Sequence, residues 1–277
     1  MKHEEGFFQG STGVRIYQQS WLPDGEPKAV LLIVHGLGEH CGRYSNVVNH
    51  LVPLGYALYG LDHVGHGKSE GSREYVERFE DFTDTLDAYR AMVTQAQPGK
   101  PVVLYGHSLG GLIGAYYLLD RQAGLAGAML SAPLSRVPEN VSAITITMGR
   151  VLARVAPKAG LLPMDPSGVS RDPAVVQAYV NDPLVFHGKT SARLAAEMLR
   201  AMRRVTAEAA KITLPVLIFQ GTADRLVNPG DSRFLYDAVS STDKTLKIYE
   251  GLYHETHNEP ECATVLRDME AWLEAHV

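Results

Sequence analysis

Short apolar runs separated by helix-like stretches are the feature that most limits how this chain can fold. Two of these runs, residues 29–34 (AVLLIV) and 56–61 (YALYGL), have the continuous apolar character of strands that are buried on both faces. The other strand-like runs are short and either apolar or alternating, at residues 14–17, 102–105, 127–130, 216–219 and 246–249. Helical patterns lie between several of them, so the sequence predicts a mostly parallel sheet covered by helices on both faces.

The segment from residue 134 to residue 210 interrupts this alternation. It contains helix-like pieces and proline-rich joints, but no convincing buried strand. We therefore predict an α/β core made of residues 1–133 and 211–277, with a helical cap, residues 134–210, inserted into it. A chain of 277 residues is long enough for one large domain with such an insertion.

Two apolar stripes at helical spacing mark the predicted cap helices. They consist of Ile144, Met148, Val151, Leu152 and Val155, and of Leu194, Met198, Met202 and Val205. Either both stripes pack onto the core, or part of this surface lines an acyl channel or touches lipid. The cap holds ten Lys/Arg and six Asp/Glu, so it carries +4 while the rest of the chain carries −9. Its arginines either form a solvated helix face or orient the cap toward anionic lipid.

Composition and charge exclude several classes of protein. The net charge is −5 and no basic cluster stands out, so we expect no nucleic-acid partner. The start, MKHEEGFFQG, lacks the apolar core of a signal peptide, and no uncharged run approaches the roughly 20 residues that span a bilayer. The expectation is a soluble cytoplasmic protein, with any membrane association peripheral. The only cysteines, Cys41 and Cys262, are expected to be free thiols.

The pattern G-x-S-x-G occurs twice, around Ser69 and around Ser108. A nucleophilic serine in this pattern needs a buried strand, a sharp turn and a helix, which together lift its hydroxyl clear of the sheet edge. Ser108 follows the apolar run 102–105 and precedes the apolar, helix-like stretch 109–119. Ser69 lies among glycines and polar residues, which are typical of a loop. The sequence therefore predicts Ser108 as the nucleophile.

A serine hydroxyl is too weakly acidic to ionise at neutral pH, so this chemistry requires a histidine as base. In hydrolases built on a parallel sheet, the partners follow in the order serine, acid, histidine, each after a strand. Asp224 and His254 each follow the end of a strand-like run, and we predict a triad of Ser108, Asp224 and His254. His257 competes with His254, but it lies closer to the last predicted helix.

The negative oxygen that forms when serine attacks a carbonyl needs hydrogen-bond donors already in place. The backbone N–H of Leu109, directly after the nucleophile, is expected to supply one donor. The second is expected from Leu37, in the sequence HGLG that follows the strand at 29–34.

Metal catalysis is the alternative for a chain with eleven histidines. Three pairs lie close enough in sequence to be considered as ligands: His35 with His40, His63 with His66, and His254 with His257. None forms the H-E-x-x-H pattern, which HETH at residues 254–257 misses by one position. We expect neither a catalytic metal nor a cofactor.

Longer motifs resemble those of monoacylglycerol lipases in the α/β-hydrolase superfamily, and they extend over nearly the whole chain. They are HGLGEHCGRY (35–44), DHVGHGKSEG (62–71), GHSLGG (106–111), NDPL (181–184), QGTADRL (220–226) and DKTLKIYEGLYH (243–254). The resemblance implies an α/β-hydrolase fold, the triad and oxyanion amides named above, and a mobile cap that opens onto an acyl tunnel. It also implies polar contacts to the glycerol head from Glu39, Arg43, His107, Tyr179 and His257. The alternative for Glu39 and Arg43 is that they pair with each other and bind nothing.

The function that the resemblance implies is a serine ester hydrolase that cleaves monoacylglycerol into fatty acid and glycerol through an acyl-enzyme. A lysophospholipase, a broad carboxylesterase or an acyltransferase would use the same triad. A lipid-binding module without activity is a further alternative, but such proteins often lack a triad residue. The chain departs from some family members at Val227, where they carry a cysteine, and at Leu37, where they carry alanine. The expected partner is a small lipid, with transient membrane contact through the cap, and the sequence predicts no oligomeric state.

Overall fold

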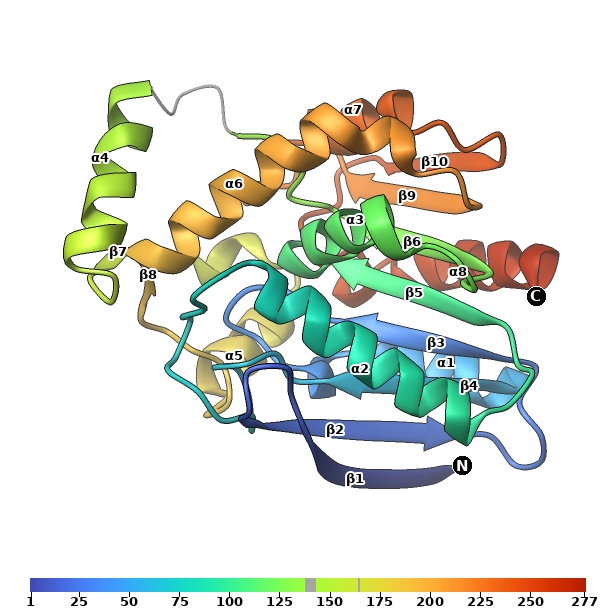
Figure 1. The fold of residues 1–277 in the computed structure, drawn as a ribbon. Helices are drawn as coiled ribbons and strands as arrows, with labels where there is room; N and C mark the ends of the chain where they lie inside the picture. Colours follow the sequence, from blue (N-terminus) through green and yellow to red (C-terminus); the bar gives the residue numbers. More distant parts are fainter. Residues whose placement is uncertain (138–142, 164) are drawn as a thin grey trace.

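An eight-stranded sheet forms the centre of the molecule, and helices cover both of its faces (Figure 1). The computed structural model describes residues 1–137, 143–163 and 165–277. The strands are β1 (Lys2–Gln9), β2 (Arg15–Leu22), β3 (Ala29–Val34), β4 (Tyr56–Leu61), β5 (Val102–His107), β6 (Gly127–Ser131), β9 (Val216–Gly221) and β10 (Lys244–Tyr249). Their order is β1-β2-β4-β3-β5-β6-β9-β10, with antiparallel pairing only at β1–β2 and β2–β4 among these strands. The predicted mostly parallel sheet between helices is confirmed.

Alternate residues of the central strands enter two separate hydrophobic cores. In β3, Val30, Leu32 and Val34 face one core, whereas Leu31 and Ile33 face the other. Side chains of a strand alternate between its faces, so burial on both sides requires an unbroken apolar run. The first core lies under α2 (Glu80–Ala96), α3 (Leu109–Arg121) and part of α7 (Gly230–Ala238), and the second under α1 (Ser45–Leu51) and α8 (Cys262–His276).

The segment that we predict to be a cap leaves the sheet after β6 and returns at β9, its neighbour. It contains α4 (Ala143–Val155), β7 (Gly160–Pro163), α5 (Pro173–Asn181), β8 (Lys189–Ser191) and α6 (Ala192–Glu208). The short strands β7 and β8 form a second, antiparallel sheet that the sequence did not predict. Gly160 and Lys189 are exposed, so this pair lacks the buried apolar run by which the central strands were recognised. The division into core and cap stays a prediction.

The two apolar stripes of this segment have different surroundings. Leu194 and Val205 of α6 are fully buried and belong to the first core, so this stripe packs onto the core. Met148, Val151 and Val155 of α4 are 67%, 56% and 74% exposed. Figure 1 shows α4 set apart from the main sheet, against the start of α6. The side chain of Ile144, which the sequence assigns to this stripe, lies outside the described residues.

The arginines of the segment also differ in their partners. Arg200 of α6 lies 2.6 Å from Glu80, and Arg204 lies 2.7 Å from Asp120. These two therefore pair with the helices that cover the sheet. In α4, Arg150 and Arg154 are exposed. Within the described residues, no helix is long and apolar enough to cross a membrane.

Candidate active site

Ser108 lies at the sharp turn between β5 and α3. Its backbone has φ 56° and ψ −116°, a conformation that costs energy for any residue other than glycine. The turn is tight, since a Cβ on Gly106 would lie 2.3 Å from the carbonyl oxygen of Gly110. A Cβ on Gly110 would lie 1.9 Å from the carbonyl oxygen of Val34 in β3. Glycine is therefore required on both sides of the serine, as the sequence pattern predicts.

Asp224 and His254 lie on the loops that follow β9 and β10. Nδ1 of His254 is 2.8 Å from Oδ2 of Asp224, and both residues are buried. The backbone N–H groups of Leu226 and Val227 donate to Oδ1 of Asp224 at 2.9 and 3.0 Å. A carboxylate held by several donors has a fixed orientation, so the imidazole bound to it is fixed as well. Ser108 and His254 line the same small cavity.

Asp224 and His254 each stabilise the charged form of the other. Burial lowers the pKa of His254, but the negative charge of Asp224 and the hydrogen bond to it outweigh burial, so the net shift is upward. Burial raises the pKa of Asp224, and the charge and hydrogen bond of His254 outweigh it, so that pKa is lowered. Asp224 is therefore ionised at neutral pH and stabilises a proton on His254.

The loop that carries Leu37 lies against Ser108. A Cβ on Gly36 would be 3.3 Å from the Cβ of Ser108, and the N–H of Gly36 donates to Oε1 of Glu39 at 2.7 Å. Leu109 is the first residue of α3, where backbone N–H groups have no partner within the helix. The structure thus places the loop with Leu37 and the start of α3, the two predicted sources of oxyanion donors, beside the serine.

Glu39 and Arg43 pair with each other and with Glu255. Nη1 of Arg43 donates to Glu39 at 2.8 Å and to Glu255 at 2.6 Å, and Nη2 donates to Glu255 at 2.8 Å. Burial tends to raise the pKa of Glu255, but Arg43 outweighs it and lowers this pKa to about 2. Tyr44 and the backbone of Gly36 also donate to Glu39. These contacts correspond to the alternative in which Glu39 and Arg43 pair with each other. Glu255 is a third member of the group, and the sequence analysis missed it although it follows His254 directly.

His107 and His257 form a buried wall beside His254. The ring of His107 lies 4.6 Å from that of His254 and 5.1 Å from that of His257, between centroids. Burial lowers the pKa of both, for His257 to about 4, so both are neutral at neutral pH. The ring of His257 stacks on that of Tyr44, with 5.0 Å between their centroids. Of the two histidines, His254 is the one that binds Asp224.

Tyr179 of α5 closes the same cavity from the inserted segment. The guanidinium of Arg43 lies 4.5 Å from the centre of its ring. Its hydroxyl is buried without a hydrogen-bond partner among the described residues, and the same is true of Nε2 of His257. Buried polar atoms are normally paired, so both atoms are available to a bound molecule or water.

Two cavities meet at Leu37. The smaller, of about 10 Å³, is polar and lined by residues that include Ser108, Tyr179 and His254. The larger, of about 950 Å³, is lined almost entirely by apolar side chains of α4 and α6 together with Leu37 and Leu134. Since Leu37 borders both, the candidate nucleophile lies where a polar chamber adjoins an apolar one.

Ser69, the serine of the second G-x-S-x-G pattern, has a different environment. It is buried, its hydroxyl donates to the carbonyl oxygen of Asp62 at 2.6 Å, and it accepts from the N–H of Tyr17 at 2.9 Å. The carboxylate of Asp62 accepts from the N–H groups of Cys41 and Lys68. Ser69 is therefore part of a hydrogen-bonded loop.

Three of the histidines considered as metal ligands, His35, His63 and His66, pack against one another, and each has a ring nitrogen bound to the backbone. His35 packs on His63, with 4.1 Å between ring centroids, while His40 lies 2.9 Å from Asp182. Burial lowers the pKa of His63 to about 3 and that of His66 to about 4. Across the part of the chain that the structure describes, no three His, Cys, Asp or Glu residues are arranged to hold a metal ion.

Comparison with known proteins agrees with this geometry. Residues 25–261 match the family model described as Serine aminopeptidase, S33. The chain is 37% identical to the monoacylglycerol lipase of Mycolicibacterium smegmatis over 99% of its own length and 98% of that protein. It is also 37% identical to the human monoglyceride lipase, over 94% of this chain and 87% of that one.

Similarity extends to solved structures. The crystal structure of Paleococcus ferrophilus monoacylglycerol lipase superimposes with a TM-score of 0.85 at 33% identity, covering 95% of this chain and 99% of that one. Sequence identity over almost the full length and a shared fold lead to the same assignment. The chain belongs to the monoacylglycerol lipase family of serine hydrolases, within the α/β-hydrolase superfamily.

Proposed function

We propose that this protein hydrolyses monoacylglycerol to a fatty acid and glycerol, with Ser108 as nucleophile and His254 as base. The observation that carries the proposal is the position of Ser108, in one cavity with the Asp224-bound His254 and next to a large apolar chamber. The names of the relatives, monoacylglycerol and monoglyceride lipases, support the same substrate.

The reaction follows from these groups. His254 takes the proton of the Ser108 hydroxyl while the oxygen attacks the ester carbonyl carbon, and the carbonyl electron pair moves onto its oxygen. The backbone N–H groups of Leu37 and Leu109 bind this oxyanion. The intermediate then collapses, the glycerol oxygen leaves with the proton from His254, and an acyl-Ser108 ester remains. A water, deprotonated by His254, attacks this ester, the bond between the acyl carbon and the Ser108 oxygen breaks, and Ser108 takes the proton from His254 as the fatty acid is released.

The apolar chamber suits the acyl chain. Its volume of about 950 Å³ is at the upper end of the range of about 300–1,000 Å³ found for ligand pockets. Met198 and Met202 of α6 and Leu152 of α4 are among its lining residues, and none of these carries a group that would need a polar partner. Burial of the hydrocarbon chain there supplies binding energy in proportion to the apolar area covered.

We place the glycerol head on the polar side of Ser108, where the cavity of about 10 Å³ has room for about one water and has to widen to admit it. In this proposal Tyr179 and His257 offer buried polar atoms without protein partners, and His107 forms the neighbouring wall. Glu39 and Arg43 act mainly through their pairing, which fixes the loop beside Ser108.

Membrane contact through α4 completes the proposal for a cytoplasmic enzyme that takes its substrate from a lipid surface. The helix exposes Met148, Val151 and Val155, and it also carries the exposed Arg150 and Arg154. Apolar side chains flanked by cations are typical of helices that lie in the interface of an anionic membrane. The same apolar residues line the chamber, so substrate would enter from the lipid side.

The decisive experiment combines active-site labelling with a substrate panel. A fluorophosphonate should label the protein at Ser108, and Ser108→Ala should abolish both labelling and esterase activity. Ser69→Ala is the matched control, since it removes the serine of the other G-x-S-x-G pattern. Monoacylglycerol, lysophospholipid and short esters, each with and without added alcohol, separate the lipase from a lysophospholipase, a carboxylesterase and an acyltransferase. Full activity of Ser108→Ala would refute the proposal.

A further inference from the structure

Gln220, the first residue of the QGTADRL motif, is a buried polar side chain to which the proposed reaction assigns no part. It lies near the end of β9 and is fully buried. Val216 and Ile218 precede it at alternate positions of the same strand, and both belong to the first hydrophobic core. An amide on this apolar face of the strand is costly unless it is hydrogen-bonded, so its presence points to a specific partner.

The amide of Gln220 faces the acid of the predicted triad. Nε2 donates to Oδ2 of Asp224 at 2.9 Å and to the carbonyl oxygen of Val227 at 3.0 Å. Both partners are acceptors at neutral pH, so the nitrogen of the amide, and not its oxygen, has to face them. Oε1 of Gln220 has no hydrogen-bond partner among the described residues. The side chain therefore acts as a double donor to the loop that follows β9.

The carboxylate oxygen that Gln220 binds is also the one that binds His254. Oδ2 of Asp224 lies 2.8 Å from Nδ1 of His254. A donor on a carboxylate oxygen stabilises its negative charge, and burial, which raises the pKa of Asp224, is opposed by several contacts that include the bond from Gln220. Gln220 is not among the residues that line the cavity with Ser108. Any influence of Gln220 on the reaction therefore passes through Asp224.

Other ionisable groups surround this pair. They are two carboxylates with their arginine, two histidines that are neutral at neutral pH, and a second ion pair: Glu39 and Glu255 with Arg43, His107 with His257, and Asp231 with Arg136. Burial opposes a charge on His254, but three carboxylates, those of Asp224, Glu255 and Glu39, outweigh it and raise the pKa of the ring. A histidine that is protonated at neutral pH cannot act as a base, so a donor that reduces this attraction favours the reactive form.

We propose that Gln220 is a positioning residue, which fixes Oδ2 of Asp224 against His254 and limits the attraction of this carboxylate for a proton on the ring. This inference rests on the proposed roles of Ser108 and His254. The two bonds from Nε2 hold Asp224 and Val227 in one arrangement. The N–H that binds Oδ2 also directs the positive end of its dipole toward the pair, which opposes a positive charge on His254 and keeps the base neutral to lower pH.

The test is Gln220→Met, which keeps the length of the side chain and removes the donor. With a short soluble ester, kcat should fall by about ten- to a hundredfold, the value of a hydrogen bond to a charged group, while KM stays unchanged. Asp224 should then hold the proton of His254 more firmly. The acidic limb of the profile of kcat/KM against pH should move up by about half to one pH unit, a three- to tenfold gain in proton affinity. A lower kcat with an unmoved limb would mean a merely structural role and overturns the inference.

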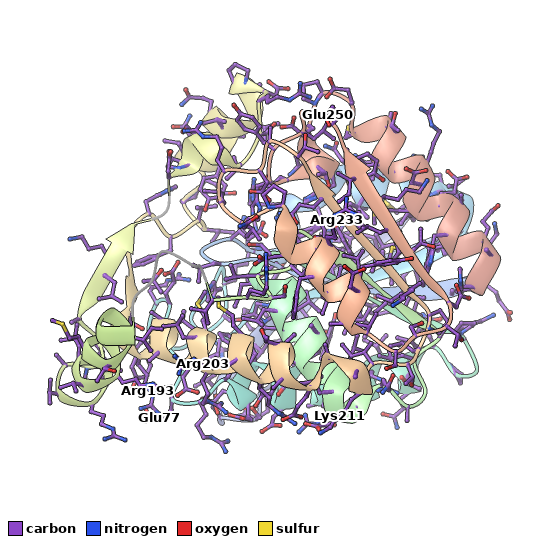
Figure 2. All side chains as sticks on the ribbon, turned by 90° about the horizontal axis from the view of Figure 1, so that it is seen from above. Glu77, Arg193, Arg203, Lys211, Arg233 and Glu250 are labelled. Carbon is purple, nitrogen blue, oxygen red and sulfur yellow. The ribbon has the colours of Figure 1, made fainter. Side chains whose placement is uncertain are left out.

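Gln122→Met is the matched control, because the amide of Gln122 also binds backbone next to β9, but at the other end of the strand. Gln122 donates to the carbonyl oxygen of Lys211 and accepts from the N–H groups of Thr213 and Leu214. Lys211 lies far from Glu250, which directly follows β10 at the end of the sheet that carries the triad (Figure 2). The control should lower stability and leave the acidic limb in place. Equal movement of the limb in both variants contradicts the proposal.

If Gln220→Met does not fold, the wild type decides the question. In protein made with isotope-labelled glutamine, the NMR signals of the Gln220 amide should shift with pH at the midpoint of the acidic limb, because protonation of His254 draws charge from Oδ2. The signals of Gln122 should not follow that midpoint, and constant signals of Gln220 overturn the inference. A wild type without esterase activity that depends on Ser108 refutes the proposed function itself, whereas normal activity with an unmoved limb in Gln220→Met refutes only the role of Gln220.

Discussion

His254 and Asp224 are joined by a buried hydrogen bond of 2.8 Å between Nδ1 and Oδ2. Replacement of Asp224 by Asn keeps the shape of the side chain but removes the charge and favours the wrong histidine tautomer. We expect kcat to fall by about 10³- to 10⁴-fold, as in other enzymes with this arrangement. Steady-state hydrolysis of a soluble ester, with circular dichroism to verify folding, provides the measurement.

The same pair determines the pH profile. His254 must be neutral to act as base, so kcat/KM should decline as pH falls through its raised pKa. In Asp224→Asn, burial acts without the opposing charge, and the pKa of His254 should drop. The acidic limb of the residual activity should therefore move to lower pH, and an unchanged limb would argue against this pairing.

Ser69→Ala should affect stability rather than chemistry. The Ser69 hydroxyl forms hydrogen bonds with the carbonyl oxygen of Asp62 and the N–H of Tyr17. Its loss leaves these two buried groups without a hydrogen-bond partner. Each such group costs about 1–3 kcal/mol. With two such groups, urea unfolding should report a loss of about 2–6 kcal/mol, while fluorophosphonate labelling of the folded fraction stays normal. Lost labelling in a well-folded variant would contradict the choice of Ser108.

Arg43→Met should destabilise the protein strongly. It leaves Glu39 and Glu255, which are 4% and 3% exposed, as two buried carboxylates without their cation. Removing one partner of a buried ion pair costs about 3–5 kcal/mol. Addition of Glu39→Gln and Glu255→Gln should recover most of the loss in chemical denaturation. No recovery would mean that Arg43 stabilises the fold through packing on Tyr179 instead.

Glu74 should make stability decrease with rising pH. Burial raises the pKa of this carboxyl to about 7 in the folded protein, against an ordinary value of 4.5, so between these values the folded state keeps a proton that the unfolded state has lost. Stability from this group is complete below pH 4.5 and falls by on the order of 3 kcal/mol as pH rises through 7. Unfolding at pH 5 and pH 8 should show this loss in the wild type and not in Glu74→Gln. Parallel behaviour of both proteins would contradict it.

Charge reversal on α4 tests the membrane contact. Each cation near an anionic surface contributes about 1 kcal/mol, so Arg150→Glu with Arg154→Glu should weaken binding to anionic vesicles by at least tenfold. Hydrolysis of a short soluble ester should be unaffected. Arg233→Glu, at an exposed site on α7 (Figure 2), serves as the control. Equal wild-type binding to anionic and zwitterionic vesicles would disprove an electrostatic contact.

Features that depend on neighbours in sequence were predicted well. The central strands are buried on both faces, so each stands out as an apolar run, and the turn at Ser108 is recognised from its flanks. Strand β1 was missed because it lies at the sheet edge, mostly exposed, where charged residues are tolerated.

Features that depend on distant contacts were not predictable. The stripes of α4 and α6 have the same periodicity, yet one is largely exposed and the other buried, because only α6 lies across α3. Glu255 meets Arg43 across 212 positions of sequence, and Glu74 is buried by segments that follow it by more than 100 residues. Patterns in a single sequence do not show which residues distant along the chain come into contact.

The insertion between β6 and β9 divides the reacting groups along the chain. Ser108 is synthesised well before the ribosome reaches Asp224 and His254, and these two are brought to it only when β9 pairs with β6 and β10 pairs with β9. A nascent chain that ends within the inserted segment has a complete serine turn but no base. Esterase activity is thus delayed until both Asp224 and His254 have been translated, and the growing chain has no esterase activity before that point.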